Sequence, residues 1–377
     1  MKTSLWQTFA LHMDANRPGF ARGPWFTMNA VLELDGALDH SALAAAFHEL
    51  QRRHDVLRTE IVDQSQLIHL APTAELELVD AVETHAEVPL AAPVRLRLAG
   101  NRLALHLHHM IADPVTLWTT LDELAMLYSN PDAPPPAAQY SDYTLNEAAL
   151  VERQRGPASD WWQARLTDAK PCPQPPPQPA NPFAYREQLL TPHELAAVDQ
   201  RTRQQRSTPL VTLLAALAAG MTPYVGAGDT LVFATLFSKR DRPQWQRVLG
   251  PCIVPSALAI PRDADIPAVR EAVVGCSRYA RFPILEADVP TRAPFFEYVP
   301  QNWPSGYHFG PVHATVAAVA GPKDTGLADI LGIRLRPTTD NALTGHFSGD
   351  GTDWTEHLVS QLCSGTRTHL LSQSEKR

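Results

Sequence analysis

Short apolar stretches bounded by turn residues divide the first half of the chain, and such stretches are typical of β-strands. They predict strands at residues 29–34, 57–62 and 94–98. After the first of these strands, Leu43, Phe47 and Leu50 recur at helical spacing and predict a helix. Asp39 or Ser41 can cap the beginning of that helix.

A further strand is predicted at residues 102–109, where leucines alternate with other residues. Successive side chains of a strand point to opposite faces of the sheet. Leu103, Leu105 and Leu107 therefore share one face, and His109 has the same parity as these leucines. The neighbouring His108 has the opposite parity, so we expect the two histidines to lie in different environments.

The chain then enters a predicted helix at residues 114–128, where Trp118 and Leu121 fall on one face. Asp113 stands directly before Pro114. An acid at the N-cap followed by proline at the first helical position is a favoured way to begin a helix.

The second half of the chain repeats the mixture of strands and helices. Helices are predicted at residues 209–222 and 354–371, and strands at residues 229–235, 295–299 and 330–335. Because strands and helices alternate in both halves, the sequence predicts a layered α/β fold.

A proline-rich segment, residues 171–182, separates the two halves. Proline lacks the amide donor and fixes its own backbone, so this segment is expected to be an extended linker. The sequence therefore predicts two domains of similar size, residues 1–170 and 183–377.

Composition and charge narrow the function classes. The net charge of -8 and the pI of about 6.0 argue against a nucleic-acid binder. The longest apolar stretch, residues 211–221, is shorter than the roughly 20 residues of a membrane-spanning helix. The first residues lack the apolar core of a signal peptide, so we expect a cytoplasmic protein. The four cysteines lie far apart, and no metal site is expected.

Residues 108–113, His-His-Met-Ile-Ala-Asp, fit the pattern HHxxxD. A neutral imidazole, with an unperturbed pKa of about 6.5, can accept the proton that an attacking amine loses. An isolated His109 would be interpreted as a hydrogen-bonded core histidine. Its position at the end of a strand and before a helix favours the catalytic interpretation.

With its surroundings, this motif resembles the condensation domain of nonribosomal peptide synthetases, in the superfamily that includes chloramphenicol acetyltransferase. An ordered series of matches is more specific than any one motif. The other matching segments are Arg53–Thr59 (RHDVLRT), Gln139–Tyr143 (QYSDY), Trp161–Trp162, Arg240–Pro251 and Gln301–Asn302.

The resemblance implies two chloramphenicol-acetyltransferase-like lobes that form a V-shaped pseudo-dimer with a central tunnel. It implies transfer of an acyl group from a carrier-protein thioester to an amine or hydroxyl acceptor, as in nonribosomal peptide and antibiotic biosynthesis. Carrier phosphopantetheine would present the substrates, and no cofactor would be bound. His109 would be the catalytic residue and His108 a supporting one, while Asp113 would pair with the arginine that matches Arg240.

Pro114 departs from the family pattern, which usually has glycine after the aspartate, and proline lacks glycine's backbone freedom. Two alternatives therefore stay open. One is an acyl-coenzyme A-dependent acyltransferase of the same fold, and the other is a catalytically silent domain that recruits a carrier or another partner. Because the chain contains no recognisable carrier or adenylation domain, we expect a free-standing enzyme that acts in trans or a piece excised from a larger synthetase.

Overall fold

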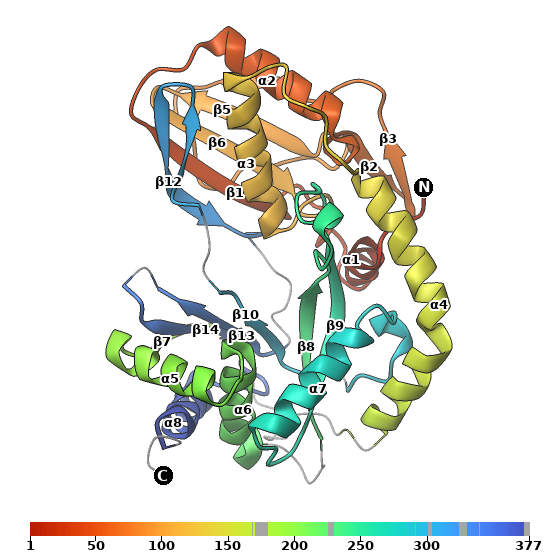
Figure 1. The fold of residues 1–377 in the computed structure, drawn as a ribbon, viewed down its shortest axis with the longest axis vertical. Coiled ribbons are helices and arrows are strands. Elements are labelled where there is room, and N and C mark those ends of the chain that lie inside the picture. Colours follow the sequence, from red (N-terminus) through yellow and green to blue (C-terminus); the bar gives the residue numbers. More distant parts are fainter. Residues whose placement is uncertain are drawn as a thin grey trace. The chain divides into compact units, whose positions relative to one another are not determined.

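The chain forms two compact units (Figure 1). Unit 1 consists of Met1–Leu150, Ser238–Val254 and Trp303–Thr325, and unit 2 of Val151–Phe237, Pro255–Asn302 and Gly326–Arg377. The computed structural model describes residues 1–167, 169, 180–224, 230–290, 292–300, 304–323, 330–338 and 340–372. Most of the predicted linker, residues 171–182, lies outside the described residues.

Each unit is assembled from segments that are far apart in the sequence, whereas the sequence predicted the contiguous domains 1–170 and 183–377. One reason is that β12 (Val312–Ala320) pairs with β1 (Thr27–Leu34) in unit 1. Apolar periodicity shows which face of a strand is buried, but it does not show which distant strand becomes its neighbour. The V-shaped arrangement and the tunnel concern the placement of the two units and stay predictions.

The sheet in the described part of unit 1 has six strands in the order β11-β12-β1-β6-β5-β4. Neighbouring strands are antiparallel, except that β4 and β5 are parallel. The strands not yet given are β4 (Leu76–Leu78), β5 (Val94–Ala99), β6 (Arg102–His108) and β11 (Gly306–Phe309). The strand predicted at residues 102–109 is confirmed except at its last residue, His109, which follows β6.

Helices α2 (His40–Arg53) and α3 (Pro114–Ser129) cover one face of this sheet (Figure 1). Asp39 caps α2 by accepting a hydrogen bond of 2.8 Å from the backbone N–H of Ala42. Both helices are therefore confirmed close to their predicted bounds. Their apolar faces bury the leucines of β6 in a core that also contains Phe47 and Leu121.

Several further elements complete unit 1. The strand predicted at residues 57–62 begins only at Thr59, because the residues before it form a 3₁₀ turn. Helix α1 (Leu5–Asn16) was not predicted from the sequence. The remaining elements are η1 (Asp55–Arg58), β2 (Thr59–Val62), β3 (Ser65–Ile68), η3 (Pro243–Trp245) and α4 (Tyr140–Leu166), whose second half belongs to unit 2.

The described part of unit 2 also has a six-stranded sheet, in the order β7-β14-β13-β10-β8-β9. Its strands are β7 (Phe183–Leu190), β8 (Thr230–Ser238), β9 (Ile253–Pro261), β10 (Phe295–Tyr298), β13 (Gly332–Pro337) and β14 (Leu343–Gly349). Its helices are α5 (Pro192–Gln204), α6 (Pro209–Met221), α7 (Ile266–Arg278) and α8 (Glu356–Ser372), with the 3₁₀ turns η2 (Thr222–Tyr224) and η4 (Ile284–Glu286). The predicted α/β class is thus confirmed.

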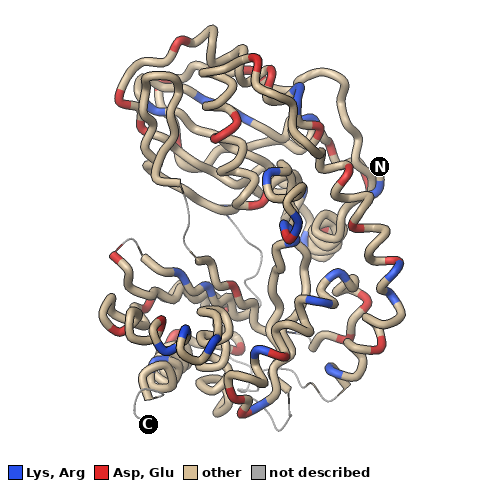
Figure 2. The backbone as a smooth tube through the Cα atoms, viewed as in Figure 1, with Lys and Arg blue, Asp and Glu red and all other residues tan. Residues whose placement is uncertain are grey.

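Lys and Arg are interspersed with Asp and Glu along both units (Figure 2). Among the described residues, no helix is long and apolar enough to cross a membrane. Location in the cytoplasm stays a prediction from the sequence. Cys252, Cys276 and Cys363 are buried.

Candidate active site

Asp113 is buried and stabilises the beginning of α3. One of its carboxylate oxygens, Oδ1, accepts hydrogen bonds of 2.7 Å from the backbone N–H and from the hydroxyl of Thr116. Pro114 occupies the first turn of α3. A backbone N–H at this position has no acceptor within the helix, so proline loses no hydrogen bond there. The N-cap arrangement predicted from the sequence is therefore confirmed, and Pro114 fits it without a break in the helix.

Asp113 also forms a buried ion pair with Arg240, as the resemblance implied. The Nη2 atom of Arg240 lies 3.0 Å and 3.2 Å from the two carboxylate oxygens, and only 7% of the arginine side chain is exposed. Arg240 also donates hydrogen bonds to the carbonyl oxygens of Trp245, Val248 and Gly250. Burial alone would lower the pKa of Arg240, but the carboxylate of Asp113 outweighs burial and raises it. The guanidinium therefore joins the start of α3 to residues 245–250.

Gly250 is required at its position for two reasons. Its φ of +134° lies in a region that side chains rarely allow, and a Cβ atom there would overlap the ring of Tyr140. Its backbone N–H donates a hydrogen bond of 3.1 Å to the hydroxyl of Thr116. The segment Arg240–Pro251, which resembles a family segment, thus supports the N-terminus of α3.

His109 lies in the turn between β6 and α3, and its backbone is fixed on both sides. Its N–H donates to the carbonyl of Phe26 at 2.7 Å, and its carbonyl accepts from the indole N–H of Trp6 at 3.0 Å. The side chain of Gln7 donates to the carbonyl of the next residue, Met110, at 3.1 Å. This turn is therefore bound by groups from the N-terminal 26 residues.

The imidazole of His109 lies against two aromatic rings. Its ring centroid is 4.8 Å from that of Phe26 and 4.8 Å from that of Trp6, with interplanar angles of 29° and 39°. Strand β6 ends at His108, so alternation along the strand does not place the His109 side chain, and its position on the leucine face stays a prediction. His109 remains partly exposed, whereas the next three residues are fully buried.

One hydrogen bond determines which nitrogen of His109 carries the proton. Nδ1 lies 2.6 Å from the carbonyl oxygen of Ala112. A carbonyl can only accept, so Nδ1 must be the donor, and the neutral ring then has its lone pair on Nε2. Nε2 is therefore the nitrogen that can receive a proton or a hydrogen bond from a nucleophile.

The contacts of His108 give it a structural role. It is fully buried, and its Nδ1 accepts a hydrogen bond of 3.2 Å from the backbone N–H of Met110. Burial lowers the pKa of His108 to about 3, although the carbonyl of Gly23 partly opposes this shift. The ring is therefore neutral at physiological pH and supports the turn that carries His109.

His106 is the second fully buried histidine of β6. Its Nδ1 lies 2.9 Å from the side-chain oxygen of Asn29, whose amide nitrogen donates to the carbonyls of Thr27 in β1 and Ala320 in β12. Burial, followed by the positive charges of Arg97 and Arg95, lowers the pKa of His106 to about 4.

The low pKa of His106 predicts acid sensitivity of the fold. The unfolded chain binds a proton at this histidine below about pH 6.5, while the folded protein binds it only near pH 4, so stability is present above pH 6.5 and is lost as the pH falls. Between pH 7 and pH 5 this residue should lower the free energy of unfolding by roughly 2 kcal/mol, at up to about 1.4 kcal/mol per pH unit. Urea unfolding at both pH values should show a smaller loss for His106→Gln than for the wild type. Equal losses would contradict the prediction.

The segments Arg53–Thr59 and Gln139–Tyr143 have structural contacts in unit 1. Gln139 accepts from the backbone N–H of Asp55 at 3.2 Å and donates to the carbonyl of Arg53 at 2.9 Å. His54 lies 2.8 Å from the buried carboxylate of Glu123 on α3. These two family segments therefore hold α2, α3 and the start of α4 together.

Of the two remaining matching segments, the structure describes one. Trp161 and Trp162 pack edge to face in unit 2, where the indole N–H of Trp162 donates to the carbonyl of Tyr279 at 3.0 Å. Gln301 and Asn302 lie outside the described residues.

Sequence reasoning missed the contacts of Trp6, Gln7 and Phe26 with the His109 turn. A signal was available for the first two, because Ser4 and Gln7 have the spacing of a capping box and thus indicate a helix at the N-terminus. Phe26 precedes the first predicted strand by a few residues and carries no recognisable motif. Among the described residues, no group of three or more His, Cys, Asp or Glu side chains could hold a metal ion.

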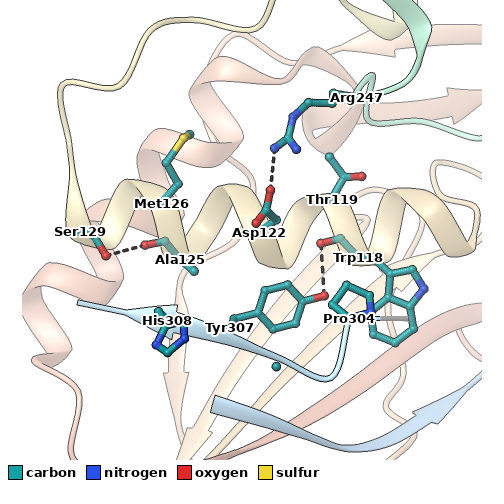
Figure 3. Close-up of a pocket in the computed structure, with 11 residues that line it drawn as sticks. Trp118, Thr119, Asp122, Ala125, Met126, Ser129, Arg247, Pro304, Tyr307 and His308 are labelled. Atoms are coloured by element: carbon teal, nitrogen blue, oxygen red, sulfur yellow. Dashed lines mark hydrogen bonds and ion pairs between the residues drawn. The ribbon is translucent and has the colours of Figure 1, made fainter. Parts of the chain in front are cut away.

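A hollow of about 520 Å³ lies on unit 1 between α3 and β11 (Figure 3). Its lining includes Trp118 and Tyr307, whose hydroxyl donates to the Trp118 carbonyl at 3.4 Å. An exposed ion pair of 2.7 Å between Arg247 and Asp122 lies at its edge. His109 is not among the lining residues, so this hollow is separate from the candidate active site.

The chain is similar to several known proteins. Residues 86–271, which include the HHxxxD motif and Arg240, match the condensation domain family model. The chain is similar to the beauvericin nonribosomal cyclodepsipeptide synthetase of Beauveria bassiana, with 24% identity over 364 residues, which cover 85% of this chain and 11% of that protein. The chain spans between 2% and 12% of the length of the curated relatives it matches.

Two solved structures have a similar fold. The X-domain from teicoplanin biosynthesis, solved in complex with OxyB, has a TM-score of 0.77 at 20% identity and covers 100% of this chain and 93% of its own. The condensation domain of the Monacolin K polyketide synthase MokA has a TM-score of 0.76 at 15% identity and covers 98% of this chain and 96% of its own. Residues 86–271 therefore match the condensation-domain family, and the two solved structures show the fold that the chain shares with such domains.

Proposed function

We propose that the chain is a condensation enzyme, which transfers an acyl group from a carrier-protein thioester to an amine or hydroxyl acceptor. The observation that carries this proposal is the state of His109. Its ring is partly exposed, its Nδ1 proton is held by the carbonyl of Ala112, and its lone pair is on Nε2. These are the properties required of a residue that assists an attacking nucleophile.

In the proposed reaction, the acceptor nitrogen or oxygen attacks the thioester carbonyl carbon and forms the new C–N or C–O bond. Nε2 of His109 accepts the proton of the nucleophile, or orients it by a hydrogen bond. The C–S bond then breaks, and the phosphopantetheine sulfur leaves and takes up the proton. Such assistance contributes about 10²–10⁴-fold, and holding the two substrates together contributes a further large factor.

Relatives support the reaction class and the setting. A nonribosomal cyclodepsipeptide synthetase and a polyketide-synthase condensation domain are among the similar proteins. We propose that this chain likewise acts in nonribosomal peptide or related natural-product biosynthesis, with carrier proteins as partners in trans. Phosphopantetheine is then a substrate arm of the carrier, and the protein itself needs no cofactor.

The donor can be identified by intact mass spectrometry. A carrier protein charged with an acyl-phosphopantetheine arm is incubated with the chain and a panel of amines and alcohols, in parallel with the same acyl group on coenzyme A. The proposal expects the carrier to lose the mass of the acyl group and the acceptor to gain it. Transfer from coenzyme A alone would favour the alternative acyltransferase of the same fold.

A second candidate is a catalytically silent domain that recruits a partner. It is favoured by the similar X-domain, which was solved in complex with OxyB, and by Pro114 in place of the usual glycine. A carrier that binds without turnover, together with insensitivity to substitution of His109, would support it.

A further inference from the structure

The imidazole of His109 lies against two side chains that have no acid–base chemistry of their own, and these two rings also contact each other, with centroids 6.3 Å apart. Trp6 comes from α1, and Phe26 precedes β1. Both are buried, with 6% and 4% of their surface exposed, so neither ring can turn away from the histidine without opening the core. Two buried aromatic rings therefore restrict the movement of the imidazole.

The helix that carries Trp6 is fixed at its own N-terminus. Ser4 and Gln7 form a complete capping box, and the hydroxyl of Tyr140 donates to that of Ser4 at 2.9 Å. The backbone N–H of Leu5 donates to the carboxylate of Glu147 at 2.8 Å. These contacts bind the first turn of α1 to the first turns of α4, within unit 1.

The same first turn of α1 binds the turn that carries the imidazole. Trp6 contacts His109 twice, because its indole N–H binds the backbone carbonyl while its ring lies against the imidazole. Gln7 is fully buried and binds the next carbonyl, that of Met110. A shift of α1 would therefore move both the backbone and the ring of His109.

We propose that Trp6 is a positioning residue that acts on the reaction through His109. This role rests on the proposed function. Its ring prevents the imidazole from rotating about its bond to Cβ, so that Nδ1 stays on the carbonyl of Ala112 and Nε2 keeps its lone pair. A ring free to rotate would spend part of its time with Cδ2 in place of Nδ1 at that carbonyl. The carbonyl would then no longer hold the proton on Nδ1, and in the tautomer with the proton on Nε2 this nitrogen is not a base.

The first test measures the tautomer and needs no turnover. Nitrogen NMR of ¹⁵N-histidine-labelled protein, with the His109 signals assigned from their loss in His109→Gln, should show Nδ1 protonated in the wild type. Trp6→Phe keeps a ring and should keep this tautomer. Trp6→Leu should give a mixture of the two tautomers.

The second test is kinetic. Trp6→Leu should lower kcat at least tenfold with the KM of the acyl-carrier donor unchanged, while Trp6→Phe should stay within threefold of the wild type. Phe9→Leu is the matched control, because Phe9 lies on the same helix with its ring 6.4 Å from that of Trp6, and it should change neither measurement. Should Trp6→Leu not fold, Trp6→Met takes its place.

A folded Trp6→Leu or Trp6→Met protein with the wild-type tautomer and the wild-type kcat would overturn the proposal. If the wild type shows no transfer at all, the proposed function fails, and the tautomer measurement still decides whether Trp6 orients the ring.

Discussion

Replacing Asp113 with alanine is expected to lower the free energy of unfolding by about 3–5 kcal/mol, the range found when one partner of a buried ion pair is removed. The guanidinium of Arg240 would stay buried without its carboxylate, and α3 would lose the N-cap that accepts from Thr116. Urea unfolding of the wild type and Asp113→Ala measures the difference directly.

Two further variants separate the contributions of Asp113. Asp113→Asn keeps an N-cap side chain but removes the charge, so its loss should be smaller than that of the alanine variant by about 1 kcal/mol, the usual contribution of a cap. Asp122→Ala breaks an ion pair of similar length on the same helix, but both of its partners are mostly exposed, so stability should hardly change. An Asp113→Ala protein as stable as the Asp122→Ala protein would contradict the interpretation of Asp113.

Replacing His109 with alanine is expected to lower the rate of acyl transfer by about 10²–10⁴-fold, because the acceptor loses the group that takes its proton. Initial rates with an acyl-loaded carrier, at equal concentrations of folded protein, measure this effect. His108 gives the contrast, since burial lowers its pKa to about 3 and keeps it neutral. His108→Asn should reduce stability but leave the rate of the remaining folded protein close to that of the wild type. A near wild-type rate for His109→Ala with a large loss of rate for His108→Asn would assign the catalytic role to His108 instead.

Local rules predicted the local parts of this site. Asp113 followed by Pro114 indicated the start of α3, and the structure has the cap at that residue. The contact between Asp113 and Arg240 joins residues 127 positions apart. No periodicity or spacing connects such residues, and only the resemblance to a family implied the pair.

The surroundings of His109 show the limit of reasoning from strand alternation. Alternation along a strand is reliable while the strand continues, but the end of a strand is set by hydrogen bonds with its neighbours. Here β6 stops at His108, and the turn that follows is fixed by Trp6 and Phe26. Because these partners come from an unpredicted helix and from the segment before β1, the surroundings of the imidazole could not be derived from its own strand.

The two units differ from the predicted contiguous domains for a related reason. The sequence marks residues 171–182 as a break, yet the segments 238–254 and 303–325 belong to unit 1. Strand β12 joins that unit through pairing with β1, almost 300 residues earlier, as between Ala30 and Val319. Strand periodicity contains no information on such pairings.

The central claim is that one imidazole, in contact with Trp6 and Phe26, assists the acceptor. Chemical rescue tests it most directly. His109→Gly leaves room beside the two rings, and transfer from an acyl-loaded carrier is followed by intact mass spectrometry with increasing concentrations of free imidazole. The account predicts that transfer is nearly absent without imidazole and increases as imidazole is added. Transfer by His109→Gly at the wild-type rate without any imidazole would contradict it.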